Sequence, residues 1–256
     1  MRVEIEVAMD YQLSSPETVL LTLEAAPLDR QIIQQEQLDI RNATLQRMRS
    51  GTGQGQRVWA CVPCDRLVLH YTARVELHRP ETPLTSLRAT PIQDLPPEIL
   101  TYLRPSRFCP SDLFEPFAAK RFGQLEGGEK IAAIRDWVAA AITYMPGSSV
   151  ATTCANDTFL SRQGVCRDFA HLVCTLARAA QIPARYTAGY SPNVTPPDFH
   201  AVAEVWLDGA WHVVDPTGMS SAANLVVIGS GRDACDMAFM ETKGPAYPIS
   251  HSVRVL

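Results

Sequence analysis

The sequence contains no run of apolar residues that approaches the roughly 18 needed for a membrane span. Residues 1–7 alternate apolar and charged side chains and lack the apolar core of a signal peptide. The net charge of −4 gives no electrostatic reason to expect nucleic acid or an anionic membrane as a partner. These absences predict a cytoplasmic protein that binds neither nucleic acid nor membrane.

The seven cysteines do not have the pattern of a disulfide framework, because their number is odd and the chain of 256 residues is long. Cys61 and Cys64 form a lone Cys-x-x-Cys, and a zinc site would need two further ligands. The apolar residues on both sides indicate strands, whereas a thioredoxin-like site needs a helix start. No acidic loop has the ligand density of a calcium site. We therefore expect no metal and no cofactor.

The first part of the chain has the pattern of an antiparallel β domain. Short apolar or alternating runs are separated by turn residues such as those at 51–55, which favours a small sandwich over residues 1–80. We expect its strands near residues 2–7, 19–23, 32–40, 45–49, 57–61 and 67–77. The prolines at 80, 83, 91, 96, 97 and 105 predict a linker over residues 81–105, with one helical turn at 97–103.

From about residue 106 the pattern changes to helices followed by strands, which predicts a second domain over residues 106–256. Apolar side chains recur at helical spacing, most clearly in residues 129–142 and 166–180. The expected helices cover residues 113–122, 129–142 and 166–180, and the expected strands cover 185–189, 201–207, 211–215 and 224–228. The sequence leaves the oligomeric state open.

Cys166 lies in the first turn of the helix expected at 166–180. Unpaired N–H groups and the helix dipole favour negative charge there, so a thiolate is stabilised. Gly164 allows a tight entry into the helix, and the N–H of Cys166 is itself a donor for an oxyanion. His171 is five residues further on, about 140° around the helix, and is badly placed as a base for Cys166. We expect a structural role for His171.

His200 and Asp215 are predicted to lie on one face of a β-hairpin. Residues 199–207 alternate at period two, and Asp208-Gly209 is a strong two-residue turn signal. A two-residue loop makes His200 and Asp215 diagonal neighbours, about 7–8 Å apart at Cβ, within reach of a hydrogen bond. A three-residue loop would move Asp215 to the opposite face.

Each of these three residues also has a structural interpretation when it is taken alone. A helix-start cysteine can be buried, a strand histidine is often structural, and Asp-Pro is a common strand end. The conjunction of the thiol, the same-face His–Asp pair and the chain order favours nucleophilic catalysis. In that arrangement Cys166 attacks a carbonyl, His200 is the base, and Asp215 orients the histidine.

Several motifs, in order over roughly residues 100–240, resemble those of the transglutaminase-like superfamily. The resemblance is to its stand-alone bacterial members, which are described as cysteine proteases, and the β-rich start resembles their N-terminal domain. The motifs are Pro105-Ser106-Arg107-Phe108-Cys109-Pro110-Ser111-Asp112, Gly164-Val165-Cys166-Arg167-Asp168-Phe169-Ala170-His171-Leu172, Ile182-Pro183-Ala184-Arg185-Tyr186, Gly189-Tyr190, Asp198-Phe199-His200-Ala201, Trp211-His212-Val213-Val214-Asp215-Pro216-Thr217 and Gly231-Arg232-Asp233-Ala234.

The resemblance implies an α+β fold: a papain-like core of helices packed on an antiparallel sheet, preceded by the sandwich. It also implies that Cys166 is the nucleophile, His200 the base and Asp215 the orienting carboxylate, with acyl transfer through a thioester. Animal cross-linking transglutaminases differ, because they have Gln before and Trp after the nucleophile, where this chain has Val165 and Arg167.

The second donor of an oxyanion hole is not fixed by the sequence. Papain-type proteases use a glutamine several residues before the cysteine, but Gln163 is only three residues ahead and is not assigned this role. Thr152, Thr153 and Asn156 are the candidates.

The sequence therefore predicts a thiol-dependent amide-bond hydrolase, a cysteine peptidase or amidase acting on a peptide or protein amide. The catalytic residues of this prediction are Cys166, His200 and Asp215. Two alternatives remain: an acyltransferase with amine acceptors, which differs in how well the site excludes water, and a non-catalytic binding module on the same fold.

Overall fold

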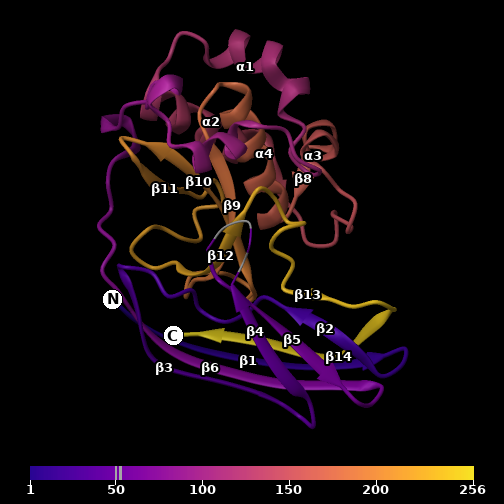
Figure 1. The fold of residues 1–256 in the computed structure, drawn as a ribbon. Coiled ribbons are helices and arrows are strands. Elements are labelled where there is room, and N and C mark those ends of the chain that lie inside the picture. The colour runs from indigo at the N-terminus through magenta and orange to yellow at the C-terminus, as the bar shows by residue number, and fades with distance from the viewer. Residues whose placement is uncertain (50, 52–53) are drawn as a thin grey trace.

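The computed structural model describes residues 1–49, 51 and 54–256 (Figure 1). The predicted turn at 51–55 falls partly on residues 52 and 53, which lie outside the described residues. The N-terminal strands are β1 (Arg2–Leu13), β2 (Glu17–Leu21), β3 (Gln31–Ile40), β4 (Thr44–Arg49), β5 (Gln56–Val62) and β6 (Arg66–Leu77).

Two antiparallel sheets form the sandwich in the lower part of Figure 1. One has the order β14-β1-β6-β3 and the other β13-β2-β5-β4, where β13 is Met240–Glu241 and β14 is Ala246–Val255. Alternate residues of β1 and β6 point inward, as period-two strands require, and fill the core between the sheets. The alternation visible in the sequence therefore fixes which face of each strand is buried.

The strand β14 comes from the end of the chain and pairs with β1, so that Ile5 lies opposite Val255. Figure 1 shows this yellow strand running beside the indigo one. The sequence-based division at residues 80 and 106 stays a prediction, and this pairing puts residues 246–255 in the same sheet as the N-terminal strands. The sheet is thus built from both ends of the chain.

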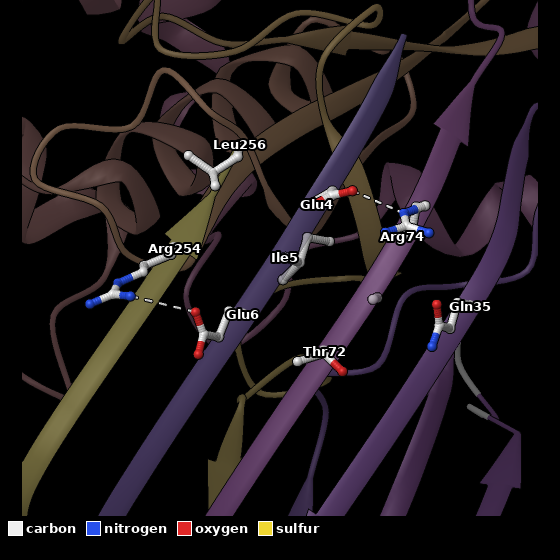
Figure 2. Close-up of a pocket in the computed structure, with 9 residues that line it drawn as sticks. Glu4, Ile5, Glu6, Gln35, Thr72, Arg74, Arg254 and Leu256 are labelled. Atoms are coloured by element: carbon white, nitrogen blue, oxygen red, sulfur yellow. Dashed lines mark hydrogen bonds and ion pairs between the residues drawn. The ribbon is translucent and has the colours of Figure 1, made fainter.

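The outer face of the β14-β1-β6-β3 sheet is polar. A pocket of about 260 Å³ lies on this face, with the ion pairs Arg74–Glu4 (2.9 Å) and Arg254–Glu6 (3.6 Å) among its lining residues. Figure 2 shows these side chains and the two ion pairs. An antiparallel sheet with one solvated face alternates apolar and polar residues in this way. None of the lining residues belongs to the candidate site described below.

The segment between the sandwich and the helices contains short 3₁₀ turns, including the predicted turn at Pro97–Leu103. The other 3₁₀ turns are Leu84–Ser86, Ile92–Asp94 and Ser111–Phe114. The α-helices are α1 (Glu115–Phe122), α2 (Gly127–Ala141), α3 (Ala155–Ser161) and α4 (Cys166–Ala179).

Helix α4 packs on a sheet with the order β11-β10-β9-β12. Its strands are β9 (Ala184–Tyr190), β10 (His200–Leu207), β11 (Ala210–Val214) and β12 (Val226–Gly231). The short strands β7 (Thr143–Tyr144) and β8 (Gln163–Gly164) pair with each other in parallel, and β8 directly precedes α4. This arrangement of helices on an antiparallel sheet, next to a β sandwich, confirms the predicted α+β fold class.

The sandwich and the helical part are joined by polar contacts. Gln31 of β3 binds both the N–H (2.8 Å) and the C=O (2.7 Å) of Val227 in β12. Tyr190 at the end of β9 donates its hydroxyl to the C=O of Leu23 (2.7 Å) and stacks on Tyr71. These buried bonds need a defined geometry, so they fix the orientation of the β11-β10-β9-β12 sheet on the sandwich.

Candidate active site

The start of α4 holds Cys166 as its first helical residue, with a half-buried side chain. Asp168, in the same turn and fully buried, accepts the N–H of Val165 (2.8 Å), which is one half of a capping box. A Cβ on Gly164 would meet the Cβ of Asp168 at 2.7 Å, so this position requires glycine. The tight entry predicted from Gly164 is therefore present, and it sets the position of the thiol.

The hairpin of β10 and β11 has the predicted register. Leu207 lies opposite Ala210 and Ala203 opposite Val214, which requires the two-residue loop Asp208-Gly209. Both loop residues have positive φ (47° and 74°), as a type I′ turn demands. The hairpin therefore leaves His200 and Asp215 on one face.

His200 and Asp215 are joined by a hydrogen bond of 2.8 Å between Nε2 and Oδ2. The two side chains are 0% and 1% exposed, so the pair is shielded from water. Its strength is greater there than it would be at the surface. The structure thus brings together the histidine and the carboxylate that the sequence singled out.

Asp215 is held by two residues that the sequence reasoning missed. Thr217 donates its N–H and its hydroxyl to Oδ1 (2.9 and 2.6 Å), and Ser220 donates the same two groups to Oδ2 (2.9 and 2.8 Å). An aspartate before Pro-Thr is a typical Asx-turn signal, and this could have revealed the bond to Thr217. Burial acts to raise the pKa of Asp215. The hydrogen bond and the charge of His200, together with the hydrogen bonds from Thr217 and Ser220, outweigh burial, so the pKa of Asp215 is lowered.

The pKa of His200 is raised to about 9. Burial alone would lower it, but the hydrogen bond to Asp215, the neighbouring thiol of Cys166 and the negative charges of both groups outweigh burial. Nε2 is engaged by Asp215, and the buried Nδ1 has no hydrogen-bond partner among the described residues. Asp215 and Cys166 therefore both stabilise the imidazolium form.

The immediate surroundings of Cys166 are mostly apolar. Its side chain packs against the cluster formed by Ala170, Tyr186, Ala201 and Met237. Besides His200, a polar neighbour is Tyr144 of β7, whose hydroxyl lies beside the thiol and the backbone N–H of Cys166 and whose pKa responds to both. Tyr144 was not singled out from the sequence, because a two-residue strand leaves no periodic pattern.

The residues proposed from the sequence as oxyanion donors lie in or near α3. The hydroxyl of Thr153 accepts the N–H of Val150 (3.0 Å), Thr152 is exposed, and Asn156 is part of α3 itself. Among the described residues, no hydrogen bond joins any of the three to Cys166. Their assignment stays a prediction without structural support.

His171 occupies the core behind α4, as expected for a structural residue. Its ring stacks on Phe108 (centroids 5.1 Å apart) and makes a tilted contact with Tyr186 (5.0 Å), and its Nε2 accepts the N–H of Ala234 (3.2 Å). Cys61 lies in β5 and is exposed, while Cys64 lies in the following turn.

In the described part of the chain, no group of three or more His, Cys, Asp or Glu side chains could hold a metal ion. Within those same residues, none of the helices has both the length and the apolar character to span a membrane.

Comparison with known sequences identifies the family. The sequence model of the Transglutaminase-like superfamily matches residues 117–216, which include Cys166, His200 and Asp215. Uncharacterized proteins of Mycobacterium leprae (28% identity over 146 residues, 53% of this chain) and Mycobacterium tuberculosis H37Rv (34% over 110 residues, 37% of this chain) are similar in part. The chain matches only 52% and 35% of their respective lengths.

Comparison with solved structures agrees with the match to the superfamily model. A candidate cysteine protease from Cytophaga hutchinsonii has 35% sequence identity and a TM-score of 0.93, and the match covers 100% of this chain and 90% of that one. The superfamily match and this neighbour together support a thiol-dependent enzyme in general. The chain belongs to the transglutaminase-like superfamily, and its N-terminal region is rich in β strands.

Proposed function

We propose that the protein is a thiol-dependent amide-bond hydrolase acting on a peptide or protein amide. The observation that carries the proposal is the buried His200–Asp215 hydrogen bond of 2.8 Å beside the thiol of Cys166. A cysteine needs such an imidazole to attack a carbonyl at neutral pH.

In the first half of the reaction, the Cys166 thiolate attacks the amide carbon, and the carbonyl π electrons move to oxygen. The tetrahedral intermediate then collapses to a thioester as the C–N bond breaks. The imidazolium of His200 gives its proton to the departing amine. The raised pKa of His200, about 9, supports this role, because the ring is protonated at neutral pH before the attack.

In the second half, neutral His200 accepts a proton from water as the water oxygen attacks the thioester carbon. The C–S bond then breaks, which releases the acid and restores the Cys166 thiolate beside protonated His200. Asp215 keeps the imidazole oriented throughout, because its other hydrogen bonds to Thr217 and Ser220 hold the carboxylate in place. A primary amine in place of water would give acyl transfer by the same steps.

The test is the pH dependence of Cys166 alkylation by iodoacetamide, followed by mass mapping of the peptide that contains Cys166. Mapping is needed because Cys61 and Cys235 are also exposed. We expect labelling at pH 6 in the wild type and a strong loss in His200→Ala. Cys166→Ala defines the background.

The matched control is His212→Ala, since His212 lies on the same hairpin and binds the C=O of Leu207 (3.1 Å) instead of Asp215. It should label like the wild type. Labelling that rises only near pH 8.5, the value of a free thiol, and that is unchanged in His200→Ala would refute the proposal. Product analysis with and without an added primary amine then separates hydrolysis from transfer.

A further inference from the structure

Tyr144 is held beside the nucleophile by the backbone. In the parallel pairing of β7 with β8, Tyr144 lies directly opposite Gly164, two residues before Cys166. Hydrogen bonds on both sides of it, Thr143 N–H to Arg162 O (2.8 Å) and Met145 N–H to Gly164 O (2.9 Å), close this short ladder. The position of Tyr144 relative to the start of α4 is therefore fixed by main-chain bonds.

The side chain of Tyr144 reaches the thiol from this position. Its half-buried ring packs against Phe169 of α4, with centroids 5.8 Å apart. The thiol and the backbone N–H of Cys166 both shift the pKa of Tyr144, which puts its hydroxyl beside these two groups. As the first residue of the helix, Cys166 has an N–H without an intrahelical acceptor. Two donors, this N–H and the Tyr144 O–H, thus meet next to the attacking atom.

We propose that Tyr144 is the second donor of the oxyanion hole, acting together with the backbone N–H of Cys166. The inference rests on the proposed function. When the thiolate attacks, the carbonyl oxygen becomes negative and accepts both hydrogen bonds; when the intermediate collapses, the C=O bond re-forms and both bonds weaken. No proton leaves Tyr144 at any step.

The environment keeps the phenol in the form that can donate. Burial, and next the negative charge of the nearby thiolate, raise the pKa of Tyr144 to about 12. The hydroxyl is therefore protonated at neutral pH. Preorganised donors of this kind stabilise the charge that develops in the transition state.

The test separates two reactions of the same sulfur. Acylation by p-nitrophenyl acetate builds a negative oxygen, whereas alkylation by iodoacetamide does not. In Tyr144→Phe we expect the rate of acylation to fall by about 10²–10³-fold. Acylation is measured by p-nitrophenol release and by the mass of acetylated Cys166. Alkylation of Cys166 should stay within a few-fold of wild type, which also shows that the site is folded.

The matched control is Tyr186→Phe. Tyr186 is a second buried tyrosine whose pKa responds to the charge of Cys166, but it makes no hydrogen bond to it. It should change neither rate. Tyr144→His, which restores an N–H donor, should recover part of the acylation rate and provides a second variant if Phe is not tolerated.

Three results would overturn the proposal. Equal loss of acylation and alkylation in Tyr144→Phe would make Tyr144 a residue that only positions the thiol. Unchanged acylation would place the second donor elsewhere, and faster acylation would show that the hydroxyl blocks the site. Failure of the proposed function is a different outcome, since it appears in wild-type protein as alkylation that does not depend on His200.

Discussion

The environments of His200 and His171 differ in one decisive respect, although both side chains are excluded from solvent. The pKa of His200 is raised to about 9, whereas that of His171 is lowered to about 3. Burial is the main cause of the lowered pKa of His171. Its Nε2 also accepts an N–H from Ala234, which requires the neutral ring. His200 is buried too, but it faces the carboxylate of Asp215.

A carboxylate is also present near His171, yet it does not reverse the effect of burial. The two oxygens of Asp233 accept the N–H groups of Phe108 (2.9 Å) and Cys235 (2.9 Å). Burial alone makes a histidine neutral, and a direct hydrogen bond to a carboxylate is what makes a buried histidine cationic. The same type of side chain is thus cationic in one buried environment and a neutral acceptor in the other.

Removing the carboxylate that faces His200 should have the largest effect on activity. In Asp215→Asn we expect p-nitrophenyl acetate turnover to fall by about 10⁴-fold, because the amide neither stabilises the imidazolium nor fixes its tautomer. The pKa of His200 should fall well below 9, since only Cys166 then opposes the effect of burial. NMR titration of the imidazole checks this.

The control for this change is Asp208→Asn, at the turn of the same hairpin, where φ is 47° and asparagine is well tolerated. Its turnover should match the wild type. A loss of less than tenfold in Asp215→Asn would mean that the two histidine environments differ for another reason.

The raised pKa of His200 also predicts how stability depends on pH. The folded state binds this proton more tightly than the unfolded state, so the stabilisation is fully present below pH 6.5 and is lost as the pH rises through about 9. The loss is at most about 3 kcal/mol. Urea unfolding of wild type and His200→Asn at pH 6 and pH 9.5 measures it, and their difference should shrink at the higher pH.

The environment of His171 predicts a pH dependence of stability with the opposite sign. His171→Phe keeps the stack with Phe108 but leaves the N–H of Ala234 without its acceptor, at a cost of about 1–3 kcal/mol at pH 7. In the wild type, the unfolded chain binds a proton below pH 6.5 that folded His171 does not take up. The stability gap should therefore narrow by about 2 kcal/mol at pH 5. A gap that stays constant would contradict the lowered pKa.

The smallest effect is expected at a third histidine, which pairs with a carboxylate near the surface. His251 and Asp198 are 3.2 Å apart with side chains 25% and 59% exposed. Water and salt screen this pair, so His251→Gln should change the free energy of unfolding by less than about 1 kcal/mol. Chemical denaturation at low and high salt checks it, and a larger effect would show that burial is not needed for a strong His–carboxylate pair.

The geometry of the site was predictable where local signals fix it. The Asp208-Gly209 turn sets the register of β10 and β11, and that register alone places His200 near Asp215. The helix start at Cys166 and the alternating N-terminal strands are local signals of the same kind. Each depends on neighbours a few residues away, and such interactions leave a readable period.

Long-range pairing left no such signal. In β14, Tyr247, Ile249, Val253 and Val255 recur at period two, but this period does not identify the partner strand β1, which is at the other end of the chain. Tyr144 depends on the pairing of two residues with two others, where periodicity has no room to appear. The sequence therefore offered no pattern that pointed to Tyr144, and Thr152, Thr153 and Asn156 stay a prediction.

The pairing of β14 with β1 has a consequence for biosynthesis. The N-terminal strands leave the ribosome first, yet one edge of β1 stays open until residues 246–255 follow. During that interval the edge can pair with other chains, as unprotected strand edges do. The order of translation and the order in which this sheet closes are therefore opposed, because residues 246–255 cover an edge of β1 that is made much earlier.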